Sequence, residues 1–287
     1  NIYSEKAIRK IFELKQRPLF NPLIVHTYSI EQLDKFVSHI PKKAKLLAET
    51  FWPGSLTLIL PKKSSIPDLV TAGKETVGVR IPNHPITLNL LEQLDFPLAA
   101  PSANPFGNIS PTNPWHVENY FRGQLKMVLD GGACQNGIES TIIGFENEEP
   151  VLYRLGSISI EEIEQIIGTI RIKNKKEKAP DAPGMLSRHY APETPTFLVE
   201  NAEKFLSNWT GKKIGVILFD KKIESQVVEY QEVLSSKSDL KEAASKLYAT
   251  LHKLDKLNLD MIVAQRFPDF GLGKSINDRL ERATKKK

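Results

Sequence analysis

The chain has 287 residues, 40% of them hydrophobic, and its formal net charge of +5 at pH 7 favours anionic ligands only weakly. This length can bury the core of one large domain or two ordinary ones, and no apolar run approaches the roughly 20 residues that span a membrane. Cys134 is the only cysteine, which excludes internal disulfides and cysteine-based metal clusters and leads us to expect a protein of the reducing cytoplasm.

The first expected element is a helix that ends near Lys15. Ser4 is placed to cap its N-terminus, and Ile8, Ile11 and Phe12 recur at the spacing of one helix face. An amphipathic helix of this kind packs its apolar face against a sheet or another helix.

The next stretch, KQRPLFNPLIVH at 15–26, leads from this helix through a proline-rich loop into a short apolar run that ends at His26. Pro18 can stop the helix, and Lys15 and Arg17 can interact with the negative end of its macrodipole. The same two cations could instead bind an anionic ligand, and these residues alone leave both interpretations open.

Residues up to about 170 continue with alternating helices and short β-rich runs. Ser29 with Gln32, and Ser159 with Glu162, each have the spacing of a capping box that opens a helix. A further helix is expected in ITLNLLEQL, and strands are expected in SLTLILPK, TVGVRIP, PLAAPS, KMVLDGG, STIIGF and PVLYRL. Some strands follow each other too closely for helical crossovers, so we predict an α/β domain with a twisted, mixed sheet over 1–170.

From 171 to 195 the pattern changes to charge and proline, with KNKKEK at 173–178 and then APGMLSRHYAPETP, as is typical of a linker. Over 196–287, the expected strands PTFLVE, KKIGVILF and DMIVAQRF alternate with a long amphipathic helix, DLKEAASKLYATLHKLDKL. This alternation predicts a smaller, Rossmann-like α/β domain at the C-terminus.

Several kinds of site are disfavoured by what the sequence lacks. PDFGLGKS at 268–275 has Pro268 where a phosphate-binding P-loop needs glycine, and no G-x-S-x-G segment supports a serine hydrolase. No two of the six histidines have metal-ligand spacing, and paired acids of the glycosidase kind are scarce. Cations, hydroxyls and one or two histidines remain as candidates.

Polar residues of this kind follow several expected strands, where loops commonly hold ligands. Each serine taken singly could be a turn or cap residue, and each arginine could lie on an exposed or ion-paired face. Their combination suits a reaction that holds anions together, such as magnesium-assisted phosphoryl or nucleotidyl transfer. The residues are Arg80, Ser102, Asn104, Ser110, Ser140 and Arg154.

Five segments in this order, KQRPLFNPLIVH, VGVRIP, PLAAPSANPFGNISPT, DGGACQNGIESTII and VLYRLG, resemble the YrdC-type domain of L-threonylcarbamoyladenylate (threonylcarbamoyl-AMP) synthases. The segment APGMLSRHYAP and the residues after it resemble the long, two-domain members of that family, so that the resemblance covers nearly the whole chain. It implies a YrdC-like catalytic domain over 1–170, a linker or lid over 171–195 and a Rossmann-like domain over 196–287.

The activity implied by the resemblance is that of a nucleotidyltransferase that forms threonylcarbamoyl-AMP and pyrophosphate from L-threonine, bicarbonate and ATP. The product would serve a downstream transferase that modifies certain tRNAs, which makes tRNA an indirect partner. Mg²⁺ is expected to accompany ATP, and the sequence identifies no protein ligand for it.

Site residues are also implied, position by position. The catalytic positions fall on Lys15, near the reacting carboxylates and phosphates, and on Arg17, which contacts ATP. The other positions implied for the nucleotide are Asn21, Thr76, Ser102, Ser110, Arg154 and Tyr190. Those implied for threonine are His26, Arg80, the backbone of Ala100, and Ser140. Arg80 is suited to hold the threonine carboxylate in a bidentate fork.

Two departures from the family pattern matter. The strand and threonine-containing loop that normally precede the first helix are absent, and we expect that the N-terminus is truncated. In the linker, Leu186 and Ser187 stand where a basic or aromatic residue is common. We nevertheless expect the segment around Tyr190 to fold over the nucleotide as a lid that excludes water.

Two alternatives remain. An RNA-binding YrdC-like module without synthase activity would also use the net positive charge, and its RNA binding would be sensitive to salt. A carbamoyl-transfer domain of the hydrogenase-maturation type shares the expected fold, but it lacks the APGMLSRHYAP segment.

Overall fold

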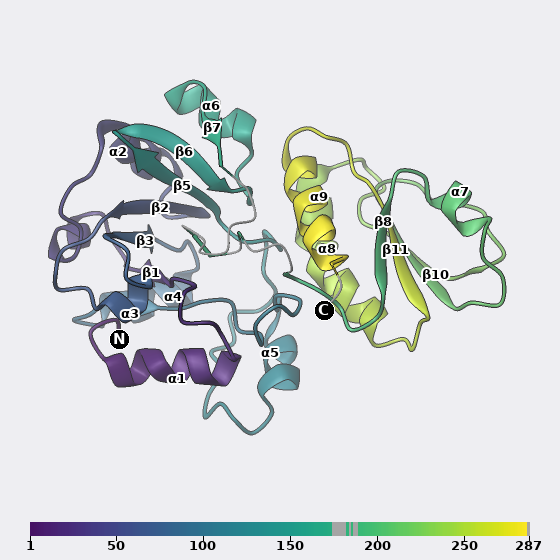
Figure 1. The fold of residues 1–287 in the computed structure, drawn as a ribbon, viewed down its shortest axis with the longest axis horizontal. Coiled ribbons are helices and arrows are strands. Elements are labelled where there is room, and N and C mark those ends of the chain that lie inside the picture. Colours follow the sequence, from purple (N-terminus) through teal and green to yellow (C-terminus); the bar gives the residue numbers. More distant parts are fainter. Residues whose placement is uncertain (174–181, 184, 186–188, 286–287) are drawn as a thin grey trace. The chain divides into compact units, whose positions relative to one another are not determined.

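The computed structural model describes residues 1–173, 182–183, 185 and 189–285 (Figure 1). The chain forms two compact units. The first unit comprises Asn1–Phe106 with Glu139–Leu186, and the second unit comprises Gly107–Ile138 with Ser187–Lys287. In these described ranges, no helix is both long enough and apolar enough to cross a membrane.

The first unit is built on a mixed sheet with the strand order β4-β1-β3-β2-β5-β6-β7. The pairs β1–β3, β2–β5 and β6–β7 are parallel, and the pairs β1–β4, β2–β3 and β5–β6 are antiparallel. The strands are β1 (Ile24–His26), β2 (Leu56–Pro61), β3 (Thr76–Arg80), β4 (Leu98–Ala99), β5 (Thr141–Glu146), β6 (Glu149–Arg154) and β7 (Arg171–Ile172). The predicted mixed sheet is therefore confirmed.

One face of this sheet is apolar and supports the core of the first unit. Val25, Val79 and Leu58 on this face are completely buried in one cluster with Ile8 of α1 and Leu47 of α2. Burial of such side chains contributes about 1.5–3 kcal/mol each. The helices of this unit are α1 (Glu5–Lys15), η1 (Glu31–Lys35), α2 (Lys42–Phe51), α3 (Asp68–Thr71), α4 (Pro85–Glu92) and α6 (Ile160–Ile167).

The helix α1 forms as the sequence predicts. The Ser4 hydroxyl accepts a hydrogen bond from the Ala7 N–H at 3.3 Å, and Ile8 and Phe12 are buried. The helix ends at Gln16, whose φ of 51° is left-handed, and the Arg17 N–H then donates to the Phe12 carbonyl at 2.8 Å. The last turn thus carries Lys15, and Arg17 begins the loop to β1.

Two predicted elements are wrong. Ser29 and Gln32 do not form a capping box; η1 there is a short 3₁₀ helix with no side-chain cap, and Gln32 instead lines a small pocket. KMVLDGG at 126–132 forms no strand in the described residues, and Met127 and Leu129 are 81% and 54% exposed. A strand needs a neighbouring strand to pair with and burial for its apolar face, and in the described residues no strand pairs with this segment while its large apolar side chains are exposed. The capping box of Ser159 with Glu162, by contrast, is confirmed.

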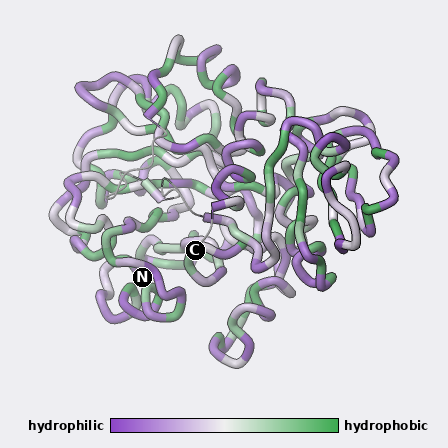
Figure 2. Tube along the Cα trace, turned by 45° about the vertical axis from the view of Figure 1, so that its right-hand side comes forward, coloured by the Kyte–Doolittle hydropathy of each residue, from purple (hydrophilic) through white to green (hydrophobic). Residues whose placement is uncertain are grey.

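The second unit contains a parallel sheet with the strand order β10-β9-β11-β8. Apolar clusters lie on both faces, one with α8 and α9 and the other with α7, as in a doubly wound domain. Figure 1 shows α8 and α9 side by side, and in Figure 2 the strands run mainly green, while the outer turns are purple. The elements are α5 (Pro114–Phe121), β8 (Thr196–Val199), α7 (Ala202–Leu206), β9 (Ile214–Leu218), β10 (Val228–Val233), α8 (Leu240–Asp255), β11 (Met261–Gln265) and α9 (Leu272–Ala283).

Residues 107–138 lie in the second unit, although the expected domain over 1–170 includes them. Ile109 and Ile138 belong to the apolar cluster of α8 and α9. The second compact unit thus includes a segment that is separated in the sequence from the rest of that unit. The domain boundaries at 170 and 195 stay predictions, since most of 174–188 lies outside the described residues.

Candidate functional site

Strand register places several predicted side chains on one face of the first unit's sheet, opposite its apolar core. Residues two apart on a strand share a face, and paired residues lie side by side. His26 of β1 pairs with Arg80 of β3, and Thr76 lies at an even spacing from Arg80 on the same strand. Leu98 of β4 also pairs with His26, so Ala100, two residues further on, faces the same way.

The same face continues across β2, β5 and β6. Ile59 pairs with the middle residue of β3, which puts Thr57 on this face. Thr57 pairs with Ile142, and Ile142 pairs with Arg154. Ser140 precedes Ile142 by two residues and therefore lies on the same face. Its hydroxyl is 2.7 Å from the Thr57 hydroxyl. We call this surface, with Thr57 and the predicted residues on it, the polar face.

Lys15 is buried at the end of α1, with 5% of its surface exposed. Its ammonium group donates to the Ser102 carbonyl at 2.5 Å and to the Asn104 carbonyl. Burial, and then the nearby charge of Arg17, lowers the pKa of Lys15 to about 7. The ammonium group is thus held by neutral carbonyls, and its charge would be stabilised by an anion.

Arg17 organises the proline-rich loop. Its Nη2 donates to the Asn21 side-chain oxygen at 2.8 Å and to the Pro22 carbonyl at 2.7 Å, and its Nε donates to the Asn21 carbonyl at 3.2 Å. Asn21 is fully buried, and its Nδ2 has no hydrogen-bond partner among the described residues. A buried donor without a partner is costly, so a ligand acceptor at this point would be favourable.

His26 and Arg80 form the part of the polar face nearest to β4. Arg80 donates from Nε to the Gly54 carbonyl at 2.8 Å, which fixes the direction of its guanidinium. Burial, and then the charge of Arg80, lowers the pKa of His26 to about 3, so the imidazole is neutral at physiological pH. Its Nδ1 is buried and has no hydrogen-bond partner in the described part of the chain.

Arg154 and Ser140 are linked directly at the start of β5. Arg154 donates from Nε and Nη2 to the Ser140 carbonyl, at 3.0 and 2.8 Å, and from Nη2 to the Ser140 hydroxyl at 3.0 Å. Its Nη1 donates to the Pro183 carbonyl at 3.0 Å. Arg154, which is predicted to contact the nucleotide, thus fixes the position of Ser140, which is predicted to contact threonine.

Thr76 lines a small pocket on the polar face together with Pro22, Gly78 and Pro183. The cavity volume is about 10 Å³, which is room for about one water molecule. A ligand bound over Thr76 would therefore lie on the polar face rather than in a preformed cavity. Gly78 leaves room at the bottom of this pocket, because a Cβ there would lie 3.3 Å from the Ile59 side chain and would occupy part of the space.

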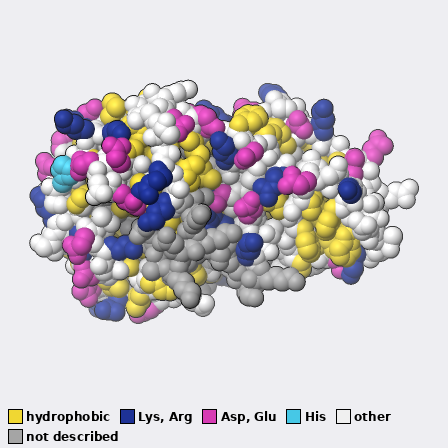
Figure 3. Space-filling model, turned by 45° about the horizontal axis from the view of Figure 1, so that its top comes forward, with side chains coloured by type: hydrophobic (Ala, Val, Ile, Leu, Met, Phe, Trp, Pro, Cys, Tyr) yellow, Lys and Arg dark blue, Asp and Glu magenta, His cyan; other side chains and the backbone are white. Residues whose placement is uncertain are grey.

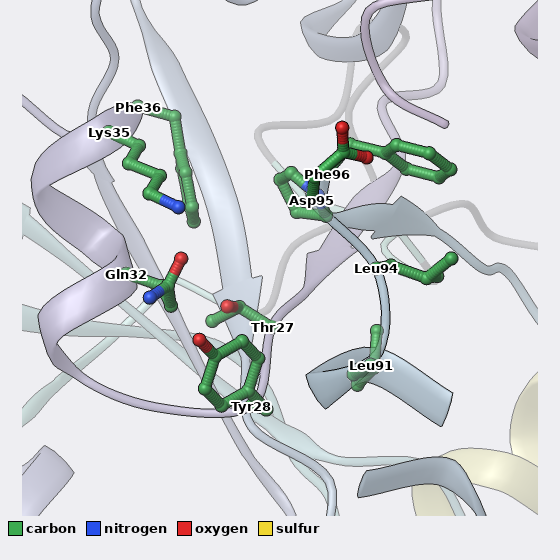
Figure 4. Close-up of a pocket in the computed structure, with 10 residues that line it drawn as sticks. Thr27, Tyr28, Gln32, Lys35, Phe36, Leu91, Leu94, Asp95 and Phe96 are labelled. Atoms are coloured by element: carbon green, nitrogen blue, oxygen red, sulfur yellow. The ribbon is translucent and has the colours of Figure 1, made fainter. Parts of the chain in front are cut away.

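A second pocket of about 10 Å³ lies beyond His26 and contains none of the predicted site residues. Figure 4 shows Gln32 and Lys35 of η1 on one side of this pocket and Leu91 and Leu94 on the other. A space of this size holds about one water molecule, so it is too small for an amino acid or a nucleotide.

Ser110 and Tyr190, two of the residues predicted for the nucleotide, lie in the second unit, and the other ten predicted positions lie in the first. Ser110 is 5% exposed. Tyr190 is completely buried, with a left-handed φ of 63°, and its ring lies 5.4 Å from the Tyr248 ring and 5.1 Å from the Arg279 guanidinium. Tyr190 is thus packed into the second unit. Leu186, Ser187 and Arg188, the preceding part of the expected lid, lie outside the described residues.

Sequence reasoning missed three residues that hold the predicted ones. Thr57 binds the Ser140 hydroxyl, Gly54 binds Arg80, and Gly156 lies against Ser140 so closely that a Cβ would be 2.4 Å from the Ser140 carbonyl carbon. A threonine inside the apolar run SLTLILPK was the available signal for Thr57. The sequence carried no comparable signal for the two glycines.

The described residues contain no group of three or more His, Cys, Asp or Glu side chains that could hold a metal ion. Mg²⁺ usually binds through few carboxylates and keeps waters and substrate phosphates as its other ligands. A magnesium ion that enters with a nucleotide would need few ligands from these residues.

The mixed sheet has the architecture of an α/β enzyme, and its polar face and the buried cations Lys15 and Arg17 offer groups that could bind small anionic and polar substrates. Residues 1–156 match the family model described as "Telomere recombination", and residues 158–284 match the model described as "Threonylcarbamoyl-AMP synthase, C-terminal domain". The chain belongs to the two-domain threonylcarbamoyl-AMP synthase family.

Relatives support this assignment over nearly the full length. The threonylcarbamoyl-AMP synthase of Pyrococcus abyssi is 40% identical, covering 99% of this chain and 86% of the relative. That of Bacillus subtilis is 38% identical, covering 99% and 85%. The crystal structure of P. abyssi Sua5 complexed with L-threonine is similar with a TM-score of 0.90 at 40% identity, covering 99% of this chain and 86% of that one. The expected fold and family are thereby confirmed.

Proposed function

We propose that this chain joins L-threonine, bicarbonate and ATP into threonylcarbamoyl-AMP and pyrophosphate, in the cytoplasm. The polar face is the observation that carries this proposal, because strand register pairs His26 with Arg80 and puts Ser140, Thr76 and Arg154 on the same face of the sheet. An amino acid and a nucleotide must meet in one place for this reaction, and one sheet face offers groups for both.

Threonine is proposed to bind over His26, Arg80 and Ser140. The guanidinium of Arg80 can hold the carboxylate in a fork, and neutral His26 adds no second charge beside it. The Nδ1 of His26 and the Ser140 hydroxyl can meet the polar groups of the amino acid. The complex of P. abyssi Sua5 with L-threonine supports this choice of amino acid.

ATP is proposed to bind along the loop from Lys15 to Pro22 and over Thr76. The Nδ2 of Asn21 is a buried donor that lacks a partner in the described residues, and a nucleotide acceptor would satisfy it. Lys15 and Arg17 supply positive charge for the phosphates. Ser102, through the same carbonyl that binds Lys15, keeps this ammonium in position.

The reaction then needs two steps. The neutral threonine amine forms a carbamate with bicarbonate, with loss of water. A carbamate oxygen then attacks the α-phosphorus of ATP, and pyrophosphate leaves. Both the carbamate and ATP are anions, and the positive charges of Lys15 and Arg17 offset their repulsion and hold them in contact.

Mg²⁺ is proposed to enter with ATP, where it would neutralise phosphate charge. The product is proposed to pass to a transferase that modifies tRNA, so that RNA is not bound for the reaction itself. On the one face drawn in Figure 3, Lys and Arg side chains are interspersed with Asp and Glu. Nucleic-acid-binding surfaces, by contrast, usually gather basic residues into a patch or stripe.

The test is to incubate the protein with ATP, Mg²⁺, L-threonine and bicarbonate and to measure pyrophosphate together with the mass of the adenylate formed. Pyrophosphate release that requires both threonine and bicarbonate is expected. Release that is indifferent to either substrate, or RNA binding that depends on salt with no ATP turnover, would contradict the proposal.

A further inference from the structure

One face of α8 contacts both segments of the second unit that carry predicted nucleotide residues. Ser245, Tyr248, His252 and Asp255 are spaced by three, four and three residues, so they share a side of the helix. We call these four residues the α8 contact face. Its partners are the segments 107–138 and 189–194, which contain Ser110 and Tyr190 respectively.

The first partner segment is held at two points. The Ser110 carbonyl lies 3.1 Å from the His252 Nε2, and since a carbonyl only accepts, this nitrogen carries the hydrogen. The His252 ring also stacks on His116 of α5, with ring centroids 3.8 Å apart. Gly137 closes the segment against the helix, because a Cβ there would lie 2.4 Å from the Ser245 Cα.

The second partner segment is held at Tyr248 and Asp255, which lie two turns apart on the same face of α8. The Tyr248 ring lies 5.4 Å from the Tyr190 ring. The Asp255 carboxylate accepts hydrogen bonds from the backbone N–H of Glu193 at 3.1 Å and of Thr194 at 2.8 Å. A bond from a charged acceptor to backbone N–H groups is about twice as strong as a neutral one, so the chain just after Tyr190 is well anchored.

The usual ligand position of a parallel sheet is filled by the unit's own side chains. Ligands of such sheets bind beyond the carboxyl ends of neighbouring strands. Beyond β9 and β11, Phe219 and Phe267 lie with ring centroids 5.4 Å apart, and Phe267 is 3% exposed. The nearby Ser235 hydroxyl donates to Glu242 at 2.5 Å. The contribution of this unit to the reaction is therefore better sought at α8 than in a crevice of the sheet.

We propose that α8 is a positioning element for the nucleotide, in which His252 fixes the Ser110 segment and Asp255 fixes the Tyr190 segment. The proposal rests on the proposed function and on the prediction from the sequence that Ser110 and Tyr190 contact ATP. Burial lowers the pKa of His252, which keeps the ring neutral with its hydrogen on Nε2. His252 acts through Ser110 and is not itself a catalytic residue.

The experiment compares His252→Phe with His252→Asn in the full chain. Phenylalanine keeps an aromatic ring for stacking on His116 but removes the donor to the Ser110 carbonyl, and asparagine restores a donor. We expect His252→Phe to raise the dissociation constant and the KM of ATP about five- to tenfold, as for the loss of one hydrogen bond. The KM of threonine should stay within about twofold, and His252→Asn should recover part of the ATP affinity.

The matched control is Lys253→Ala, on the same helix but with an exposed side chain that pairs with Glu232. It should leave both KM values and the melting temperature unchanged. If His252→Phe does not fold, Asp255→Ala takes its place, since the half-buried Asp255 accepts the two backbone hydrogen bonds that hold the second partner segment. It should show the same selective loss of ATP affinity.

Three outcomes would overturn the proposal. In the first, a folded His252→Phe or Asp255→Ala variant binds ATP as the unaltered chain does. In the second, the KM values of ATP and threonine rise equally, which indicates general loosening. In the third, the unaltered chain neither binds ATP nor makes the adenylate, and the proposed function then falls together with this inference. The first two leave the proposed function intact.

Discussion

Binding of ATP is expected to make Lys15 take up a proton. In the free protein, burial and the charge of Arg17 lower the pKa of Lys15 from 10.5 to about 7. At pH 8 only about a tenth of the side chains then carry the proton. A phosphate group near the ammonium favours its charged form, so as the pKa returns towards 10.5 the uptake approaches about 0.9 proton per ATP bound.

Calorimetry of ATP binding at pH 8, in two buffers of different ionisation enthalpy, measures this uptake. The heat should differ between the buffers by the difference in their ionisation enthalpies multiplied by the number of protons taken up. Lys15→Met keeps an unbranched side chain that is one atom shorter and removes the titrating group, so its uptake should be near zero. Equal uptake by both chains would refute the reasoning, because the proton would then be bound by another group of the protein or by the nucleotide.

The same pKa predicts how stability depends on pH without a ligand. Below about pH 7, folded and unfolded chains both hold the Lys15 proton, and the cost of burying the charge is present in full. Between about pH 7 and 10.5 the folded chain has lost a proton that the unfolded chain still binds, so stability rises with pH. The free energy of unfolding should gain about 2 kcal/mol more from pH 7 to pH 9 than in Lys15→Met. Urea unfolding at both pH values measures this, and parallel pH dependence of the two chains would count against a buried, titrating Lys15.

Three further substitutions test the polar face and the loop. Thr57→Val removes one partner of the Ser140 hydroxyl and leaves another, Arg154, and we expect a severalfold rise in the KM of threonine at constant ATP affinity, with Thr57→Ser as the control that restores it. Gly156→Ala puts a Cβ 2.3 Å from the Thr141 nitrogen. It should lower the free energy of unfolding by about 1–3 kcal/mol, measured in urea, and weaken threonine binding. Unchanged stability would mean that the backbone there can shift freely. Lysine at position 17 cannot make the hydrogen bonds of the Arg17 guanidinium to Asn21 and Pro22, so Arg17→Lys should lower the ATP affinity measured by calorimetry about tenfold. An unchanged affinity would remove Arg17 from the proposed nucleotide site.

Much of the first unit could be predicted because its signals are local. The Ser4 cap and the apolar spacing of α1 lie within one segment, and the apolar run of β2 and the alternation in β3 are visible in the sequence. The order of the strands is not a local property, and it is this order that sets His26 beside Arg80. The resemblance supplied the candidate residues, and their assignment to substrates stays a prediction.

The rest could not be predicted because it depends on contacts between distant segments. Nothing near Gly137 in the sequence indicates that it approaches Ser245, and nothing near His252 indicates the Ser110 carbonyl. The residues 107–138 carry too few periodic apolar positions to reveal which core they join. Their place in the second unit follows from packing against α8, which sequence periodicity does not encode.

The docking of segment 107–138 on α8 also sets an order of events during synthesis. Gly137 and Ile138 leave the ribosome long before the helix Leu240–Asp255 that they pack against. Roughly a hundred residues separate them, which at about 5–20 residues per second is a delay of about 5–20 seconds. Through that interval the apolar side chains of Ile109 and Ile138 have no core to enter, so the nascent chain would gain most from chaperone protection before α8 emerges.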